Sequence, residues 1–490
     1  MATSPATAPS AQAPLRSFSD LPGPRRMPVF GNALQIDRTR FHQQLEGWAQ
    51  EFGPLYRLRF VARDVLVVGD HAEIAKILRN RPDGFHRTSR LNEIWTEMGL
   101  PPGVFGANGE TWKAQRRMVM AGFDPAHVKS YFPSLLKVSR RLARRWQRAA
   151  DEQAFIDLQP DLMRFTVDTI AGLAFGADVD TLSSDDDVIQ RHLDQIFPAL
   201  FKRILAPIPW WRWWPSAADK ALKTSLLEVQ AAVTDFIAKA RARMQERPEL
   251  ARQPENLLQA MIVAADAEGG ALNDEQVAGN VLTMLLAGED TTANTLAWML
   301  HLLWTHPHEL KRATEEVRQV LGAAREPGLE HLAALDFIEA CAHETMRLKP
   351  VAPMLPLQAA TELQIADVAV PRNCVVISLL RRDSVSDAHV PQAGEFLPDR
   401  WLQDGEPGQP THLATQAKRI SMPFGAGPRI CPGRYLALME MKMAMATLLA
   451  NFDIVDVSTA DGQAPLEYLN FTMAPLGLRM RLNARLPAHG

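Results

Sequence analysis

The run of residues 273–304 constrains the fold most, because its apolar residues recur at three- and four-residue spacing without a break. Asn273 fits a helix N-cap, and Gln276 fits the partner position of a capping box. His306-Pro307 stops the pattern. The spacing therefore predicts one helix that crosses the whole molecule.

The rest of the chain is predicted to be helical, with a few short strands. Further helical spacing covers most of residues 112–322 and continues at 335–349 and 433–452. Strand-like runs occur at residues 55–60, at 64–69 and within 361–380. No repeat or linker divides the pattern. We predict one large, mainly α domain with a minor sheet at residues 29–490, after a flexible tail at 1–28 that is rich in Ala, Pro and Ser.

Composition excludes several classes of protein. With 53 Lys plus Arg against 56 Asp plus Glu, the net charge of -3 gives no reason to expect a nucleic-acid partner. The chain has no signal-peptide core and no unbroken apolar run of about 18 residues, so we expect a soluble, cytoplasmic protein and a monomer. The three cysteines are far apart, which argues against a disulfide framework or a zinc site.

One cysteine lies in an unusual loop, PFGAGPRICPG, at residues 423–433. A lone cysteine is more often a small buried residue than a ligand. Here, however, a helix is expected to begin at Pro432 and Gly433, and a helix N-terminus favours the thiolate form of Cys431. Glycines let the backbone approach a flat ligand, and Arg429 can bind its anionic groups. Such a loop suits a large anionic cofactor.

The pattern Phe424-x-x-Gly427-x-Arg429-x-Cys431-x-Gly433 resembles the haem-binding loop of the cytochrome P-450 family. The resemblance implies that family's fold, with haem b between the long central helix and the cysteine loop. It makes Cys431 the proximal iron ligand, which favours O–O cleavage. Phe424 would then pack near the sulfur, and Arg429 would bind a haem propionate.

Other motifs resemble the same family in the expected order. Glu344-x-x-Arg347 places both side chains on one helix face, and a later F-x-P-x-R-W segment supplies Arg400. The resemblance implies that these three residues form a buried charge network with a structural role.

Two further motifs are implied to bind the haem propionates. Trp112-x-x-x-Arg116 keeps both side chains on one helix face. Arg382 matches another family contact, although Arg381 beside it leaves the choice between the two open.

The middle of the long helix reads Ala287-Gly288-Glu289-Asp290-Thr291-Thr292, and these residues include poor helix formers. A hydroxyl of Thr291 can bond the carbonyl of Ala287 and bend the helix. In the family, this bend opens a groove beside the haem, where O₂ sits. Asp290 and Thr291 are then the catalytic residues, which deliver protons. The alternative is a helix that is kinked for structural reasons alone.

The resemblance also implies a lipophilic small-molecule substrate. The segments that contact it in the family are mostly apolar here. The candidate pocket residues are Ala287, Val351, Ala352, Met354, Phe471 and Thr472.

The sequence also suggests two kinds of partner, a membrane surface and an electron-transfer protein. The segment ILAPIPWWRWWP begins at Ile204 and ends at Pro215, and its tryptophans fit either peripheral membrane contact or packing on neighbouring helices. No flavin or nicotinamide domain follows residue 490, so electrons are expected from a separate ferredoxin or flavodoxin with its reductase. A basic patch could steer that partner, formed by Lys113, Arg117, Arg429 and Arg434.

The function predicted on this basis is a monooxygenase that inserts one atom of O₂ into a C–H or C=C bond. Two alternatives are a peroxide-driven or dehydratase-type haem-thiolate enzyme and a non-catalytic haem- or lipid-binding protein.

Overall fold

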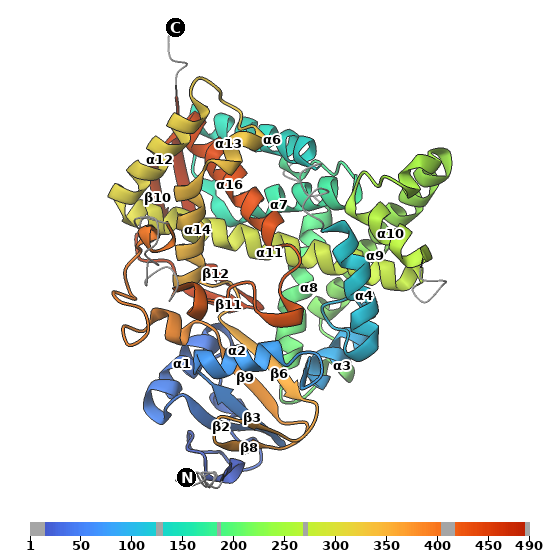
Figure 1. Cartoon of the computed structure of the whole chain (residues 1–490), viewed down its shortest axis with the longest axis vertical. Helices are drawn as coiled ribbons and strands as arrows, with labels where there is room; N and C mark the ends of the chain where they lie inside the picture. Colours follow the sequence, from blue (N-terminus) through green and yellow to red (C-terminus); the bar gives the residue numbers. More distant parts are fainter. Residues whose placement is uncertain (1–14, 124–130, 184–187, 268–272, 403–416, 486–490) are drawn as a thin grey trace, which may run out of the picture.

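A computed structural model describes residues 15–123, 131–183, 188–267, 273–402 and 417–485. Helices fill most of the molecule, and the larger sheet lies at one end, near the N-terminus (Figure 1). This arrangement confirms the prediction of a mainly α fold with a minor sheet. The α-helices are α1 Phe41–Phe52, α2 His71–Arg79, α3 Ser89–Glu97, α4 Gly109–Gly122, α6 Phe132–Asp151, α7 Leu158–Phe175, α8 Val188–Leu205, α9 Ala217–Glu246, α10 Leu257–Ala267, α11 Asp274–Thr305, α12 Pro307–Leu321, α13 Leu329–Ala333, α14 Asp336–Leu348 and α16 Arg434–Asn451.

Strands are short and come from distant parts of the chain. They are β1 Arg16–Ser17, β2 Leu55–Phe60, β3 Arg63–Val68, β4 Phe85–His86, β5 Ile156–Asp157, β6 Met354–Ala359, β7 Leu363–Ile365, β8 Val368–Val370, β9 Val375–Leu379, β10 Phe452–Thr459, β11 Glu467–Asn470, β12 Thr472–Pro475 and β13 Leu478–Ala484. Short 3-10 helices that matter below are η5 Trp210–Arg212, η7 Arg382–Val385, η8 Pro398–Trp401 and η9 Gly427–Arg429.

The long helix forms as predicted. Asn273 accepts a hydrogen bond from the backbone N–H of Gln276 at 3.0 Å, and Gln276 accepts one from Asn273 at 3.0 Å. α11 then runs unbroken to Thr305, buried along most of its length, and crosses the middle of the molecule (Figure 1). It therefore offers side chains from its middle turns to the centre of the protein.

The larger sheet has the strand order β2-β3-β9-β6-β4. The predicted hairpin of β2 and β3 is present, with Leu55 opposite Val68. Alternation along β3 buries both faces, because Val65 and Val67 pack with α1 while Leu66 and Val68 pack with α2. The sheet thereby fixes α2, whose C-terminal end contacts η9.

The start of the folded part lies earlier than the predicted boundary at residue 28. Arg16 and Ser17 form β1, which pairs in parallel with β8, and the Arg16 guanidinium bonds Asp367 at 2.7 and 2.8 Å. Leu21 is also buried. These contacts place residues 15–28 in the folded part, which corrects the predicted boundary, and residues 1–14 lie outside the described part. A single strand pair was too short to stand out in an Ala/Pro/Ser-rich sequence.

The C-terminal strands bring a hairpin to the long helix. β11 and β12 are antiparallel, and Phe471 between them has φ +80°. β12 packs against α11, so the turn reaches the middle of that helix. Among the helices of the described ranges, none combines the length and apolar character needed to cross a membrane.

Candidate active site

The cysteine loop is pressed against α2. The backbone N–H of Cys431 donates to the carbonyl of Phe424 at 2.9 Å, which closes the loop on itself. Gly427 has φ +69°, and a Cβ there would lie 2.7 Å from both the Leu78 carbonyl oxygen and Arg79 Cα. No other residue fits this position.

Cys431 differs from the other two cysteines in its surroundings. Cys341 and Cys374 are buried, whereas Cys431 keeps part of its surface exposed. Burial raises the pKa of the Cys431 thiol, but the Gly433 N–H and the charges of Arg116 and Arg434 oppose that rise. α16 begins at Arg434 rather than at Pro432, with Gly433 as its N-cap. The sulfur therefore lies where positive potential can stabilise a metal-bound thiolate.

The loop and α4 are joined by two arginines. Arg116 donates to the Ile430 carbonyl at 2.7 Å, and Arg429 donates to the Ala107 carbonyl at 2.5 Å. The Arg429 guanidinium also lies over the Trp112 ring, 4.6 Å from its centroid. The structure thus brings together Trp112, Arg116 and Arg429 as the motifs predicted.

Beside them lies an arginine cluster, formed by Arg81, Arg87 and Arg429. Within the described part of the chain, none of the three forms an ion pair, and Arg81 Nε and Nη2 and Arg429 Nε are buried without a hydrogen-bond partner. Burial is the main cause that lowers their pKa values, to about 8, 9 and 10, and neighbouring guanidinium groups lower them further. Such a cluster fits a ligand that carries more than one negative charge, as the two propionates of haem do.

Sequence analysis missed Arg81 and Arg87. The available signal was weak: both lie in the short segment that follows Arg79, the last residue of α2. Arginines on a loop have no periodic spacing, so their burial could not be predicted.

Within the described part of the chain, the middle of α11 has one face that protein side chains cover only in part. Ala287 is exposed, and Gly288, Asp290 and Thr291 are partly exposed, although the helix is buried on either side of them. The Thr291 hydroxyl donates to the Ala287 carbonyl at 2.7 Å, as predicted. The expected bend does not interrupt the helix, since α11 is continuous. Gly288 also has a packing role, because a Cβ there would lie 3.2 Å from Ile170 on α7.

Asp290 is held by a residue of the C-terminal hairpin. The Thr472 hydroxyl donates to Asp290 Oδ2 at 2.9 Å. Asn294 Nδ2 donates to Thr472 Oγ1 at 3.3 Å, and Gln159 Nε2 donates to Asn294 Oδ1 at 2.8 Å. Burial raises the pKa of Asp290 to about 6, while the Thr472 bond opposes the rise. Thr472, predicted as a substrate contact, is buried and instead positions this carboxyl group.

The remaining predicted pocket residues divide into two groups. Ala352 is exposed and Val351 is partly exposed, whereas Met354 is 9% exposed and packs in the core with Trp298. Met354 was predicted to line the substrate pocket, and its place in the core corrects that prediction. Phe471 stacks on Phe197 with ring centroids 4.3 Å apart, and Phe105 lies 6.1 Å away. An apolar aromatic group thus lies at the turn that also carries Thr472.

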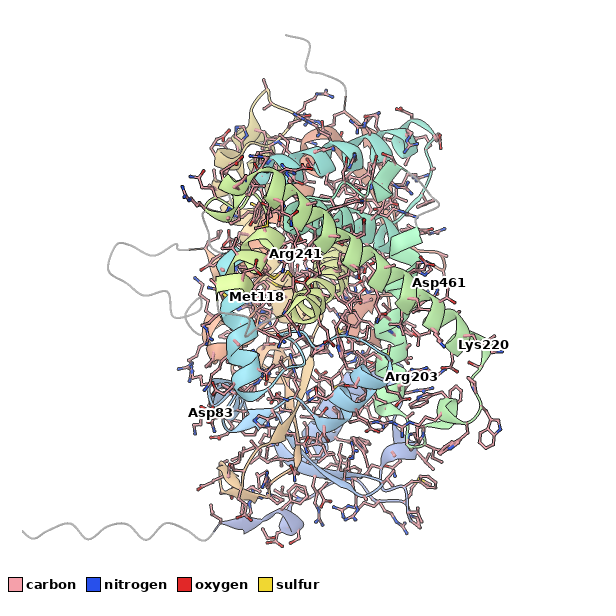
Figure 2. The ribbon with its side chains drawn as sticks, turned by 90° about the vertical axis from the view of Figure 1, so that its right-hand side faces the viewer. Asp83, Met118, Arg203, Lys220, Arg241 and Asp461 are labelled. Carbon is pink, nitrogen blue, oxygen red and sulfur yellow. The ribbon has the colours of Figure 1, made fainter. Side chains whose placement is uncertain are left out.

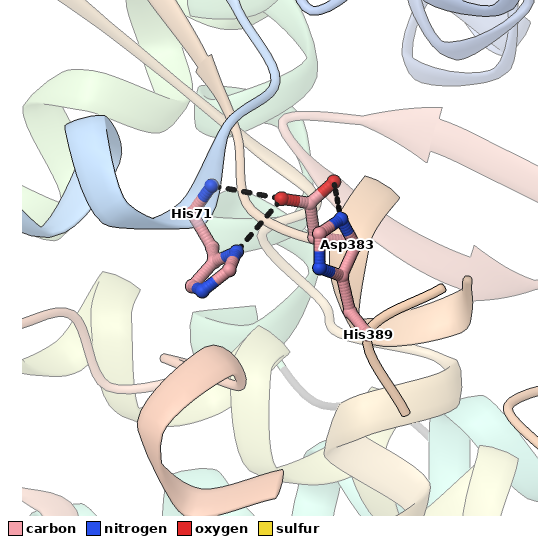
Figure 3. Close-up of side chains that lie close together, drawn as sticks. All are labelled: His71, Asp383 and His389. Carbon is pink, nitrogen blue, oxygen red and sulfur yellow. Dashed lines mark hydrogen bonds and ion pairs between the residues drawn. The ribbon is translucent and has the colours of Figure 1, made fainter. Parts of the chain in front are cut away.

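Arg382 does not join the arginine cluster. Its guanidinium donates to Asp383 Oδ1 at 2.6 Å, in a group that also contains His71 and His389 (Figure 3). Arg381 binds Glu46 at 2.6 Å and Glu467 at 2.8 Å. Both adjacent arginines are thus paired with carboxylates outside the arginine cluster, and this corrects the prediction that Arg382 contacts the cofactor.

Glu344 lies at the centre of the expected network. Arg347 bonds both of its carboxylate oxygens at 2.8 Å, and Arg400 bonds Oε1 at 3.1 Å. Trp401 Nε1 and the Leu397 N–H also donate to this carboxylate, at 2.9 and 3.0 Å. Because Glu344 and Arg347 are 0% exposed, the network is sealed from water. It fixes α14 to η8.

The tryptophan segment divides in two. Trp211 is buried and donates to Glu97, and Arg212 pairs with Glu93 at 2.6 Å and Glu97 at 2.7 Å. The next two indoles, Trp213 and Trp214, are 59% and 75% exposed. They precede α9, which crosses one side of the molecule from near Lys220 toward Arg241 (Figure 2).

Three of the four residues of the predicted basic patch make contacts with neighbouring residues. Arg429 belongs to the arginine cluster, and Lys113 pairs with Glu110 at 2.7 Å. Arg434 lies over the Tyr435 ring, 4.4 Å from its centroid, next to the cysteine loop.

Comparisons with known proteins point in one direction. A family model described as "Cytochrome P450" matches residues 21–481. The chain is 26% identical over 484 residues to "Self-sufficient cytochrome P450 monooxygenase CYP505E5" of Aspergillus kawachii (strain NBRC 4308), covering 96% of this chain and 44% of that protein. It is 27% identical over 456 residues to "Protein LUTEIN DEFICIENT 5, chloroplastic" of Arabidopsis thaliana, covering 92% and 75%. It is 29% identical over 428 residues to "Carotene epsilon-monooxygenase, chloroplastic" of the same plant, covering 83% and 76%. The chain thus spans less than half the length of the fungal relative.

Proposed function

The chain belongs to the cytochrome P450 family, and we propose that it is a haem-thiolate monooxygenase that inserts one atom of O₂ into a lipophilic substrate. Three connected features carry this proposal: the cysteine loop, the arginine cluster, and the partly exposed middle of α11 with Asp290 and Thr291. Arg429 belongs to both the loop and the cluster, and α16, which follows the loop, contacts α11.

The cofactor of this family is haem b with a cysteine thiolate ligand. We assign that ligand to Cys431, because it alone of the three cysteines is partly exposed and lies between cationic groups. The arginine cluster, with Trp112 and Arg116, would bind the propionates. When bound, the haem supplies the binding and reductive activation of O₂.

Proton delivery is the task we assign to α11. Thr291 offers a hydroxyl on the partly exposed face, and Asp290 offers a carboxyl group whose pKa of about 6 allows both protonation states near neutral pH. Thr472 acts as a positioning residue, since it holds the carboxyl group without itself lying on that face.

The substrate is proposed to be lipophilic. Phe105, Phe197 and Phe471 form an aromatic group, and Ala287, Val351 and Ala352 are small or apolar with exposed surface. These side chains favour burial of apolar area over specific polar contacts. A relative is named as a carotene monooxygenase, and this name supports a lipophilic substrate.

We propose that electrons come from a separate ferredoxin or flavodoxin with its reductase. Arg434 lies next to the cysteine loop and offers a cationic group to an acidic partner. A fused reductase, as the name of the fungal relative indicates for that protein, is the competing arrangement. We also propose a cytoplasmic location, with which the three free cysteines agree, and a monomer.

A spectroscopic experiment tests the ligand. The haem-loaded protein should give a red-shifted Soret band for its reduced CO complex, and Cys431→Ser should abolish that band while Cys374→Ser keeps it.

An isotope experiment tests the reaction. The protein is supplied with an electron-donor system, ¹⁸O₂ and lipophiles that change the haem spin state, and one ¹⁸O atom should enter the product. Spin shifts without labelled product from any donor would support a binding protein instead. Labelled product from H₂¹⁸O₂ alone would support the peroxide-driven alternative.

A further inference from the structure

A group of two histidines and one aspartate lies outside the site described above, where the start of α2 meets the segment after β9 (Figure 3). His71 Nδ1 lies 2.9 Å from Asp383 Oδ2, and His389 Nε2 lies 3.6 Å from Asp383 Oδ1. One donor atom from each residue lies within 4.8 Å of the others. The two imidazole rings are 5.0 Å apart and meet edge to face.

We propose that His71, Asp383 and His389 bind a divalent transition-metal ion of the zinc class. Zinc takes imidazole nitrogen and carboxylate oxygen as ligands, and donors in a tetrahedral site with bonds of about 2.0–2.1 Å lie about 3.3 Å apart. Each histidine lies near this distance from one oxygen of the carboxylate, at 2.9 Å from Oδ2 and 3.6 Å from Oδ1, and one donor atom of each residue lies within 4.8 Å of the other two. The ion takes the place of the proton between Nδ1 and Oδ2, so the neutral His71 ring carries its proton on Nε2.

Partial exposure gives the ion access to the group. The side chains of His71 and His389 are 17% and 33% exposed, while that of Asp383 is 2% exposed. The two rings can therefore turn toward an incoming ion, and a water can complete the coordination. The buried carboxylate gives the site its fixed point.

Two donors orient that carboxylate from outside. Arg382 donates to Oδ1 at 2.6 Å, and the His71 backbone N–H donates to Oδ2 at 2.8 Å. Outer donors of this kind hold a ligating carboxylate in place. Arg382 also brings a positive charge close to the ion, so we expect micromolar affinity rather than the tight binding of a structural zinc site.

The site would clamp one end of α2. The other end of this helix carries Leu78 and Arg79, which touch Gly427 of the cysteine loop. A metal ion at His71 would therefore restrain a helix that forms part of the wall behind the cofactor loop.

Titration calorimetry of the haem-loaded protein with ZnCl₂ tests the proposal. We expect one ion per chain with a micromolar Kd, and no heat of binding with MgCl₂, because magnesium prefers oxygen ligands. His389→Ala and His71→Gln should each weaken zinc binding at least about 10-fold. The glutamine variant keeps the backbone N–H that bonds Asp383, so the start of α2 should stay intact.

His308→Ala is the matched control, because His308 is an exposed imidazole 2.9 Å from one carboxylate, that of Glu309. It should leave the affinity unchanged. The proposal would be overturned if the unmodified protein bound no zinc below 1 mM, or if both His389→Ala and His71→Gln bound it as tightly as the His308→Ala protein. Zinc should also raise the Tm of the unmodified protein and not that of a His71→Gln, His389→Ala double variant.

Discussion

Burial changes the acid–base behaviour of several single side chains in and around the site. The pKa of Asp290 rises to about 6 and that of Glu440 to about 8, while the pKa of Arg81 falls to about 8. In all three cases the loss of water around the charged form is the largest cause. The pKa of each group therefore depends strongly on the neighbour that stabilises its charged form. For Asp290 and Glu440 this neighbour is a threonine hydroxyl, and for Arg81 it is the expected haem propionate.

Thr472→Val should raise the pKa of Asp290 further, because it removes the hydroxyl that stabilises the carboxylate and keeps the shape of the side chain. The pH midpoint of the coupling between electron use and product formation should move upward by roughly half to one unit. Haem content and substrate spin shift should not change. Thr472→Ser keeps the hydroxyl and should behave as the unmodified protein; equal profiles for all three proteins would remove the positioning role.

Arg81→Met should have opposite effects on the protein with and without haem. Without cofactor, it removes a buried charge that has two unpartnered nitrogens and should stabilise the fold by about 1–3 kcal/mol. With cofactor, it removes an expected propionate contact and should speed haem transfer to apomyoglobin about 10-fold. Thermal unfolding and the transfer rate measure the two effects. Arg79→Met, at an exposed position, should alter neither. Slower haem loss in Arg81→Met would contradict the assignment.

Local spacing predicted the contacts that form within one helix and missed those between distant segments. The bond from Thr291 to Ala287 and the pair of Asn273 and Gln276 follow from four- and three-residue spacing. Thr472 and Asp290 are 182 positions apart, and no periodic pattern relates them. The same limit hid Arg81 and Arg87, whose burial depends on how the loop after α2 packs.

At the scale of elements, two buried carboxyl groups form polar junctions between helices. Glu344 on α14 binds η8 through Arg400, Trp401 and a backbone N–H. Glu440 on α16 hydrogen-bonds Thr292 on α11. The first junction pairs the carboxylate with two arginines, whereas burial and the Thr292 hydrogen bond are what act on the second carboxyl group within the described residues.

Glu344→Ala should strand Arg347 and Arg400, which are almost completely buried. The cost is about 3–5 kcal/mol, so little soluble, haem-loaded protein is expected. Soluble yield and the ratio of haem to protein absorbance measure the effect. Glu315→Ala breaks an exposed pair with Lys311 at 3.7 Å and should cost under about 0.5 kcal/mol. A fully loaded Glu344→Ala protein would show that the network is dispensable.

Glu440→Gln should stabilise the protein increasingly between pH 5 and 8. The folded-state pKa of Glu440, about 8, lies above its ordinary value of 4.5, so only the folded protein holds the proton in this interval. Stability of the unmodified protein therefore falls as pH rises toward 8 and then levels off. The gain from glutamine reaches an upper limit of about 5 kcal/mol.

Urea unfolding midpoints at pH 5.5 and 8 would measure this gain. Glu330→Gln, at a side chain that is 76% exposed, is the control and should show no such trend. A constant difference between the Glu440→Gln and unmodified proteins at both pH values would mean that Glu440 is ionised in the folded state.

At the scale of the whole molecule, the exposed end of the tryptophan segment is the surface that most resembles a membrane contact. Trp213 and Trp214 project next to the start of α9, while the cation between the indoles, Arg212, is already paired with two glutamates. The indoles, rather than charge, would drive any attachment.

Vesicle sedimentation should therefore detect binding that depends weakly on salt. We expect Trp213→Ser, Trp214→Ser to reduce the bound fraction on phosphatidylcholine vesicles several-fold, whereas Arg212→Gln changes it little. Exposed Leu466, which lies in another part of the fold, offers a control as Leu466→Ser. Absence of binding to any vesicle would remove the membrane contact.

The overall architecture was largely predictable, because a long helix shows apolar residues at regular three- and four-residue spacing in the sequence. α11, α14 and α16 lie where their apolar spacing placed them. The sheets were only partly predictable, since β3 pairs with β9 across some 300 residues and β1 has two residues. Pairing over such distances depends on the finished core.

The arginine cluster has a consequence for the life of the protein in a cell. A chain that has folded without haem keeps three guanidinium groups that have no ion-pair partner among the described residues; that of Arg81 is buried and those of Arg87 and Arg429 are half-buried. Arg429 also lies over Trp112 of α4. Such a chain would open more often and be degraded sooner than the loaded form. Cofactor supply would then set the abundance of the enzyme after translation, so that iron- or haem-starved cells would clear it without any dedicated regulator.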